Sequence, residues 1–440
     1  MLVLKFGGTS VGSIENMING KNIINNGQQK VVVLSAMSGT TNALVKVADY
    51  IKNNKPEEAL IIIDALRNTY NLTIKTLITT PELYKTVFVY VNNVFNSLEA
   101  IVNKLYDDLL YNQIVSQGEL LSTFIFSYYL QQENINAVLL PALDFMRIDK
   151  NKEPDLFYIQ QDFEAVFKEA QEANIYITQG FICLDDLGHI SNLQRGGSDY
   201  TATIIGAVVK AEEVEIWTDI DGMHNNDPRY VENTKPISNL SFDEAAELAY
   251  FGAKILHPQT VTPVRADNIP VRLKNTMNPT AYGTLINDDH TENGVKAIAA
   301  KDHITAIKIK SGRMLQAHGF LRKVFEIFEV YETSIDMITT SEVAVSLTID
   351  DDKNLNKILE ELQKFSSVEV DKNQTIVCLV GHSVVNHQET FKLFQILQDV
   401  KIRMISYGGS RNNISLLINA DDKIKTLGKL NNYLFHLVTH

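Results

Sequence analysis

Cysteine is scarce in this chain of 440 residues, which contains only Cys183 and Cys378, far apart in the sequence. Two distant cysteines match neither a disulfide framework nor the clustered spacing of a structural zinc site, so we expect two reduced thiols. Basic residues are also in the minority, because 40 Lys and Arg stand against 53 Asp and Glu, which gives a net charge of −13. This balance argues against a nucleic-acid-binding surface as the main function.

Long apolar runs are missing as well. The most apolar internal stretch, Leu120 to Leu130, is well short of the roughly 20 residues that a membrane-spanning helix needs. The N-terminal apolar run reaches Gly7 and Gly8 too early for a signal peptide. We therefore expect a cytoplasmic protein without a membrane partner. At about 150 residues per domain, the length predicts about three domains.

The first part of the chain, residues 1–290, alternates short β-branched runs with longer helical patterns. This alternation is typical of an α/β fold in which helices cover a mostly parallel sheet. Residues 56–111 are almost wholly helical in pattern and predict a helical lobe. Ser241 and Glu244 have the spacing of a capping box, which predicts a helix start at this point. Strands are expected at 2–6, 30–34, 135–140, 175–178, 214–217 and 271–273, and helices near Ile14, Asp199, Ser241 and Pro258.

A polar, charged segment at 287–294 separates this part from two repeats of a β-α-β-β-α pattern. Such repeats predict a pair of ferredoxin-like modules. We place the first module at 300–371 and the second at 372–440, and residues beyond Asn431 could return to the first module. The expected helices are 319–331, 355–365, 389–398 and 424–434, and the expected strands are 303–310, 343–349, 368–370, 375–380, 402–406 and 414–419.

The first expected strand runs directly into Lys5-Phe-Gly-Gly-Thr-Ser10. Glycines let a backbone approach a ligand closely, and free N–H groups at a helix N-terminus attract anions. The segment is neither a Walker A motif nor a dinucleotide-binding Gly-x-Gly-x-x-Gly, because the required residues do not follow at the right spacing. It predicts a phosphate cradle, although a strand followed by two glycines is often purely structural.

Two further clusters carry charged groups beside turn residues. Arg195 and Asp199 flank a second glycine pair at the start of an expected helix, where Asp199 alone could simply be a cap. Residues 217–229 follow an expected strand and contain three aspartates and an arginine; a solvated acidic turn is the alternative. Phosphoryl transfer needs backbone donors, a lysine and acids that organise cations, and nucleotides bind after parallel strands. The three clusters together favour such a site.

Five sequence blocks resemble the signature blocks of aspartate kinases and occur in the order of that family. They are Lys5 to Val11, Ser116 to Glu119, Arg195 to Ala202, Trp217 to Asp219 with Asp227 to Arg229, and Glu247 to Pro258. The resemblance implies an amino-acid-kinase fold followed by two ACT-type regulatory modules. It implies a monofunctional enzyme that uses ATP and Mg²⁺ to phosphorylate the β-carboxylate of L-aspartate, the entry to lysine, threonine and methionine synthesis.

The resemblance also implies roles for individual residues. Lys5 would neutralise the transferring phosphoryl group, and Asp199 would orient that lysine. The residues assigned to aspartate are Ser35, Thr41, Glu119, Phe181, Arg195 and Ser198, with Arg195 on the α-carboxylate and Glu119 on the ammonium group. The residues assigned to ATP are Lys5, Gly7, Gly8, Thr9, Ser10, Thr218, Asp219, His224, Arg229 and Lys254. His224 stands where the family usually has Tyr, and Gln194 where Gly is common.

The C-terminal half resembles that of the lysine-sensitive members of the family. The residues implied for the effector are Met314, Gly319, Phe320, Leu321, Asp336, Thr340, Ser341 and Glu342. Gln316 and Ala317 depart from the usual His and Ser, so lysine is the leading effector and threonine the next. Paired ACT modules imply a homodimer or homotetramer. The alternatives are a glutamate-type kinase of the same fold, modules that serve only in dimerisation, and a non-catalytic amino-acid sensor.

Overall fold

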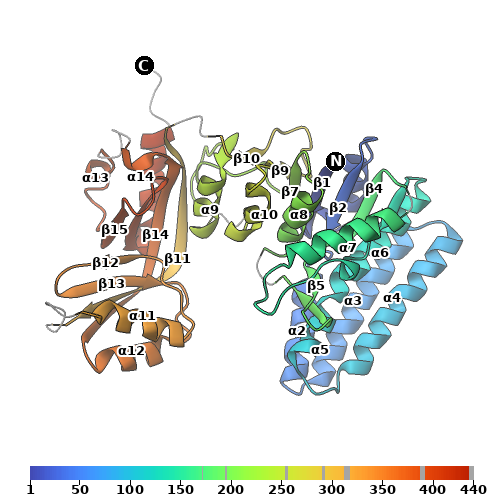
Figure 1. Cartoon of the computed structure of the whole chain (residues 1–440), viewed down its shortest axis with the longest axis horizontal. Helices are drawn as coiled ribbons and strands as arrows, with labels where there is room; N and C mark the ends of the chain where they lie inside the picture. The colour runs from blue at the N-terminus through green and yellow to red at the C-terminus, as the bar shows by residue number, and fades with distance from the viewer. Residues whose placement is uncertain are drawn as a thin grey trace. The chain divides into compact units, whose positions relative to one another are not determined.

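The computed structural model (Figure 1) describes residues 1–170, 172–193, 196–252, 256–289, 293–311, 318–386 and 392–435. Its contacts divide the chain into two compact units. The first unit comprises Met1–Met223 and Leu256–Asp288, and the second comprises His224–Ile255 and Asp289–His440. None of the described helices is both long and apolar enough to cross a membrane.

A mostly parallel sheet forms the centre of the first unit. The strands that this unit contributes to the sheet lie in the order β3 (Ala137–Leu139), β4 (Ile175–Gln179), β2 (Lys30–Leu34), β1 (Leu2–Phe6), β7 (Val214–Thr218), β9 (Val271–Asn275) and β10 (Thr284–Asn287). Neighbouring strands are parallel from β3 to β9, whereas β10 is antiparallel to β9. The carboxyl ends of the parallel strands therefore meet at one edge, where ligands of open α/β sheets bind. A short hairpin of β5 (Ile182–Leu184) and β6 (Ile190–Asn192), not expected from the sequence, follows β4.

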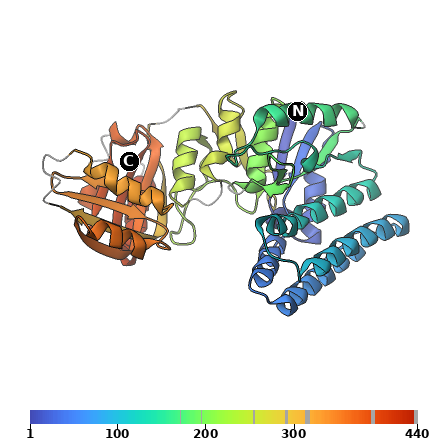
Figure 2. The ribbon, with the colours of Figure 1, turned by 60° about the horizontal axis from the view of Figure 1, so that its bottom comes forward.

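The helices of this unit include the predicted helical lobe. They are α1 (Ile14–Ile24), α2 (Thr40–Lys52), α3 (Pro56–Leu77), α4 (Pro81–Ile101), α5 (Asp108–Val115), α6 (Gln117–Gln132), α7 (Leu156–Glu169), α8 (Gly197–Val208) and α10 (Thr262–Arg265). The lobe predicted at 56–111 is confirmed by α3, α4 and the start of α5, and Figure 1 and Figure 2 both show α3 and α4 side by side.

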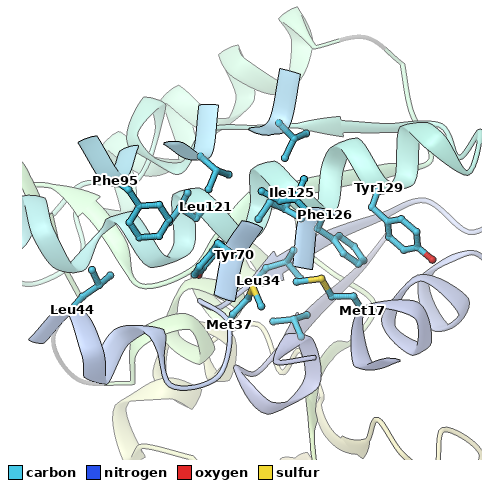
Figure 3. Close-up of a cluster of buried hydrophobic side chains, with 14 of the residues drawn as sticks. Met17, Leu34, Met37, Leu44, Tyr70, Phe95, Leu121, Ile125, Phe126 and Tyr129 are labelled. Atoms are coloured by element: carbon cyan, nitrogen blue, oxygen red, sulfur yellow. The ribbon is translucent and has the colours of Figure 1, made fainter. Parts of the chain in front are cut away.

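The lobe is joined to the sheet by a buried apolar cluster (Figure 3). Tyr70 of α3 is fully buried and meets Phe95 of α4 edge to face, with their ring centroids 5.7 Å apart. Leu34 at the end of β2 and Met17 of α1 belong to the same cluster. Aromatic and aliphatic side chains of this size each stabilise a fold by about 1.5–3 kcal/mol when they leave water. This packing fixes the turn after β2.

The second unit is built on an antiparallel sheet. Its strands lie in the order β12 (Ile338–Thr340), β13 (Ala344–Ile349), β11 (Gly294–Lys310), β14 (Ser367–His382), β16 (Asn413–Asn419) and β15 (Met404–Tyr407). The other elements are β8 (Asn239–Ser241), α9 (Phe242–Tyr250), α11 (Phe320–Val330), α12 (Leu355–Gln363), α13 (Lys392–Ile396) and α14 (Lys423–Phe435). The capping box at Ser241 and Glu244 is confirmed, because each side chain bonds the other residue's backbone N–H.

Two long strands, β11 and β14, serve both ferredoxin-like modules. Residues 294–301 of β11 pair with 376–382 of β14, and Ile298 packs in the core of the second module. Residues 305–310 pair with β13, and Ile307 packs in the core of the first module. The strand changes register near His303, which has φ +62°.

The residues that cross from one module to the other are therefore those at the start of β11, which come before the first module in the sequence. The sequence leaves open whether the residues beyond Asn431 pack with the first module. In the structure, α14 packs against the second core instead, through Leu427, Leu430, Tyr433, Leu434 and Phe435. The expected outer limits of the modules, 300–371 and 372–440, stay predictions.

Candidate functional site

An ion pair lies at the carboxyl edge of the first unit's sheet. Lys5 is the penultimate residue of β1, and Asp199 lies in the first turn of α8, where an acid interacts favourably with the helix dipole. The Lys5 Nζ and Asp199 Oδ1 atoms are 2.6 Å apart, and their side chains are 11% and 17% exposed. The pair is thus sheltered but still reachable from solvent. The structure brings together the two residues that the sequence assigned to catalysis.

The glycine turn after β1 packs closely on its surroundings. A Cβ atom on Gly7 would lie 3.3 Å from Lys5 Nζ, and one on Gly8 would lie 3.1 Å from the Ala36 carbonyl oxygen. A Cβ on Gly12 would lie 2.6 Å from the Gly8 carbonyl oxygen, a distance that only glycine allows. Gly7 therefore keeps the surface beside the Lys5 ammonium group free of a side chain, while Gly8 and Gly12 let the turn pack closely on the backbone around it.

Two of the expected phosphate contacts already have partners within the protein. The Gly7 N–H donates to the Trp217 carbonyl oxygen at 3.1 Å. The Ser10 hydroxyl is buried, donates to the same carbonyl at 3.2 Å and bonds Thr276 at 2.7 Å. These bonds tie the turn to β7 and to the residue after β9. Thr9, by contrast, is exposed.

Three of the residues assigned to aspartate, Ser35, Phe181 and Ser198, lie near the ends of β2 and β4. Ser35 directly follows β2 and donates a hydrogen bond to the Ser198 hydroxyl of α8 at 2.9 Å. Gly180 lets α8 approach, since a Cβ there would lie 2.3 Å from the Ser198 Cβ. Phe181 has φ +67°, and its N–H donates to the Thr201 hydroxyl at 3.0 Å. Three separate segments, the ends of β2 and β4 and the start of α8, are thereby fixed around one location.

Glu119 is the buried acid of this location. It lies in the first turn of α6, is 3% exposed, and its Oε1 accepts a hydrogen bond from the Ala36 N–H at 3.2 Å. Burial raises the pKa of its carboxyl group to about 7. Its Oε2 atom is buried and receives no hydrogen bond from any other described residue. A buried carboxylate oxygen of this kind costs free energy unless a donor or cation meets it.

The helices around this location supply further residues, some of which the sequence did not single out. Thr41 lies half-buried in the first turn of α2, and its neighbour Thr40 is bonded to the Tyr70 hydroxyl at 3.0 Å. Ser122 of α6 donates to the Ser35 carbonyl oxygen at 2.8 Å. The only sequence signal for Tyr70 and Ser122 is their position on the buried faces of predicted helices.

The residues assigned to ATP fall in both units. In the first unit, Thr218 ends β7 and donates to the exposed Asp219 at 3.2 Å. In the second unit, His224 Nδ1 lies 3.0 Å from the Thr234 hydroxyl. Arg229 is largely exposed and forms a bidentate pair with Asp227, with contacts of 2.6 to 3.1 Å. Arg195 and Lys254 lie outside the described residues.

The residues assigned to the effector surround the start of α11 and the β12–β13 turn. Gly319, with φ +89°, caps α11, which begins with buried Phe320 and partly exposed Leu321. Thr340 ends β12, and the exposed Ser341 and Glu342 form the turn to β13. Met314 lies outside the described residues.

Asp336, the acid expected to meet the effector's ammonium group, is almost fully buried. Its Oδ1 is 2.7 Å from the Lys301 Nζ and accepts a hydrogen bond from the Tyr250 hydroxyl at 2.8 Å. Burial raises the pKa of Asp336 against the effect of these two partners. Its Oδ2 is buried and accepts no hydrogen bond among the described residues. Lys301 and Tyr250 were not predicted to lie here.

Comparison with known proteins gives two family matches. The amino acid kinase family matches residues 1–275, and the ACT domain matches residues 377–434. The chain is 34% identical to lysine-sensitive aspartokinase 3 of Escherichia coli, with 99% of both chains covered. It is 36% identical to aspartokinase 1 of Arabidopsis thaliana, over 95% of this chain and 77% of that one.

Solved structures give the same result. The crystal structure of E. coli aspartokinase III with aspartate and ADP has a TM-score of 0.85 at 34% identity, and 99% of this chain and all of that chain are covered. The complex of the same enzyme with lysine and aspartate has a TM-score of 0.81 at 33% identity, with 99% of both chains covered.

Proposed function

The chain belongs to the aspartate kinases, and from this premise we propose how its residues divide the work. The reaction transfers the ATP γ-phosphoryl group to the β-carboxylate of L-aspartate and yields ADP and 4-phospho-L-aspartate. A carboxylate oxygen forms the new bond to phosphorus while the bond to the β-phosphate oxygen breaks. The acceptor is already an anion at pH 7, so the reaction needs no general base.

Lys5 neutralises the transferring phosphoryl group in this proposal. Its ammonium group lies beside the glycine backbone and is held by Asp199 at 2.6 Å. Positioned charge of this kind supplies most of the catalysis in phosphoryl transfer. Asp199 accordingly acts by orienting Lys5.

Glu119 gives the proposal its main support in the structure. An α-ammonium group at its buried, unpaired Oε2 would supply the missing partner of the carboxylate. Arg195 takes the substrate α-carboxylate in a bidentate geometry that lysine could not reproduce. Ser35, Thr41, Phe181 and Ser198 complete the aspartate site. The domain limits belong to the same proposal, with the aspartate part at 1–195, the ATP part at 196–290 and the two modules after it.

ATP is assigned to Gly7, Gly8, Thr9, Ser10, Thr218, Asp219, His224, Arg229 and Lys254, together with Lys5. The reaction also requires Mg²⁺, which neutralises phosphate charge when it is bound. The described residues contain no cluster of three His, Cys, Asp or Glu side chains. We propose that Mg²⁺ is held mainly by phosphates and water, as is usual for this ion, and we assign it no protein ligand.

Lysine is the proposed feedback inhibitor. The related E. coli enzyme is lysine-sensitive and was crystallised with lysine. In this chain, the buried and unpaired Oδ2 of Asp336 suits an effector ammonium group. We further propose that the ACT modules form a homodimer or homotetramer and that the enzyme works in the cytoplasm.

An aspartyl-hydroxamate assay tests this function. Purified protein with ATP and Mg²⁺ should form hydroxamate with L-aspartate, but not with L-glutamate or without an acceptor. Product with glutamate alone would identify a glutamate-type kinase, and no product with either would favour a non-catalytic sensor. Adding lysine, threonine or methionine then identifies the effector, and lysine should inhibit most strongly.

A further inference from the structure

A short loop of the second unit, Asn225–Val231, is built into the ACT region. We call it the nucleotide loop because it carries Arg229. The Ile298 N–H of β11 donates to the Asn225 carbonyl oxygen at 2.8 Å. Val231, at the other end of the loop, is 8% exposed and belongs to the apolar core of the second module. Both ends of the loop are therefore anchored on that module.

Asn226 forms a buried link between the loop and α14. Its Nδ2 donates to the Leu427 carbonyl oxygen at 3.3 Å and to Asn431 Oδ1 at 3.2 Å. Asn226 is 2% exposed and Asn431 is fully buried. Two buried amides that pair across 205 residues of sequence define one position of the loop against the helix.

Lys423, the first residue of α14, forms a second link. Its Nζ lies 2.6 Å from Asp302 Oδ2 and 3.7 Å from the centre of the Tyr230 ring. The other oxygen of Asp302 accepts a hydrogen bond from Thr375 at 2.9 Å. Lys423 thus meets an acid of β11 and, through a cation–π contact, an aromatic ring of the loop.

These links end at Arg229. Asn226 Oδ1 accepts the Asp227 N–H at 2.9 Å, and the Asp227 carboxylate holds the Arg229 guanidinium group through Nε and Nη2. Burial opposes ionisation of Asp227, but Arg229 and Lys423 hold its pKa below the usual value. A continuous set of polar contacts thus leads from α14 to the arginine.

We propose that α14 of the C-terminal ACT module is a positioning element for nucleotide binding, through Lys423 and Asn431. Neither residue belongs to the predicted catalytic, substrate, nucleotide or effector sites. This inference rests on the proposed assignment of Arg229 to ATP. Loops that are held in the binding geometry before the ligand arrives avoid the entropy cost of ordering at that moment. Loss of either link should therefore weaken ATP binding and leave aspartate binding unchanged.

Steady-state kinetics of Lys423→Met test the proposal. The variant keeps the aliphatic stem and loses the charge, so we expect the KM for ATP to rise roughly fivefold or more. The kcat and the KM for aspartate should stay within about twofold of wild type. Lys423→Arg keeps the cation and should restore most of the ATP affinity. Lys429→Met is the matched control, because Lys429 lies on the same helix but pairs with Asp399 at 2.5 Å.

Asn431→Leu provides an independent variant with similar volume and no amide, and the same rise in the KM for ATP is expected. An unchanged KM for ATP in a folded Lys423→Met or Asn431→Leu enzyme would overturn the inference. An equal rise in Lys429→Met, or an equal rise in the KM for aspartate, would also overturn it, since a general loss of structure would explain both. Wild-type protein that forms no aspartyl hydroxamate would instead refute the proposed function.

Discussion

Lysine–aspartate pairs occur at key places in both units, with very similar geometry but different surroundings. Lys5–Asp199 in the first unit has a separation of 2.6 Å, and Lys301–Asp336 and Lys423–Asp302 in the second unit have separations of 2.7 and 2.6 Å. The Lys5 ammonium group has glycine backbone beside it. In the second unit, tyrosine rings lie 4.3 Å from Lys301 and 3.7 Å from Lys423.

This difference shows that the same ion pair can serve two purposes. Glycines leave the charge of Lys5 accessible to an anionic ligand, as phosphoryl transfer requires. A tyrosine ring instead occupies one side of the ammonium group with an internal contact, although the three lysine side chains are similarly sheltered, at 11%, 18% and 10% exposed. In the second unit, the lysine of each pair therefore holds a tyrosine ring, Tyr250 or Tyr230, against the ACT region.

Each of these two lysine–aspartate pairs includes one residue of strand β11. Lys301 and Asp302 are neighbours on β11, directly before His303, where the strand changes register. Lys301 meets Tyr250 and the predicted effector acid Asp336, whereas Asp302 meets Lys423 beside Tyr230 of the nucleotide loop. A displacement of β11 at this point would therefore change both lysine–aspartate pairs.

Glu119 extends the comparison, because it is a buried carboxylate whose cation the substrate is proposed to supply. Glu119→Gln should raise the KM for aspartate by roughly 10²- to 10³-fold, the usual effect of removing one member of a buried charge pair. Steady-state assays measure this, with an unchanged KM for ATP as the control. A normal KM for aspartate would remove Glu119 from the site.

The same substitution should change how stability depends on pH. The folded-state pKa of Glu119 is raised from 4.5 to about 7, so the folded protein binds more protons than the unfolded chain between these values. Stability contributed by the protonated form is therefore lost as pH rises from about 4.5 to 7, by roughly 2–3 kcal/mol. Denaturation of wild type and Glu119→Gln across this range should show the loss in wild type only. Parallel curves would contradict the buried, unpaired state of the carboxylate.

Asp336→Asn should weaken inhibition by lysine about tenfold or more, because an amide of equal size lacks the charge that attracts the effector's ammonium group. The lysine concentration for half-maximal inhibition measures this effect. Activity without lysine should be retained. Full lysine sensitivity in the variant would place the effector elsewhere.

Tyr250→Phe should have the smallest effect, a roughly threefold weaker inhibition by lysine, since it removes one hydrogen bond to Asp336 and keeps the ring over Lys301. Tyr230→Phe is the matched control, because Tyr230 contacts Lys423 through its ring. Equal shifts in the two variants would show that the Tyr250 hydroxyl has no special role.

The central part of the fold was predictable from local sequence patterns. The strands at 2–6 and 30–34 match β1 and β2, and the capping box matches the start of α9. The merged strands β11 and β14 were not predicted, because a strand that continues from one module into the next has no local boundary signal. The three-residue strands β5 and β6 are too short for a periodic pattern.

The candidate site divides in the same way. Lys5, Asp199, Ser35, Ser198 and Glu119 stand in recognisable motifs, and the structure brings them to one edge of the sheet. Tyr250, Lys301, Lys423 and Asn431 were missed, because their partners are distant in sequence and only the fold brings them together. Without the three-dimensional fold, a single lysine or asparagine on a predicted helix is interpreted as a solvent-exposed or helix-capping residue.

Removing the three ammonium groups one at a time tests the account most directly. The kcat of Lys5→Met, Lys301→Met and Lys423→Met would be measured at saturating aspartate and ATP, with folding checked by circular dichroism. We predict that kcat falls by roughly 10²-fold or more in Lys5→Met and stays within about twofold of wild type in the other two. A folded Lys5→Met enzyme with normal kcat, or an equal loss in all three variants, would contradict the account.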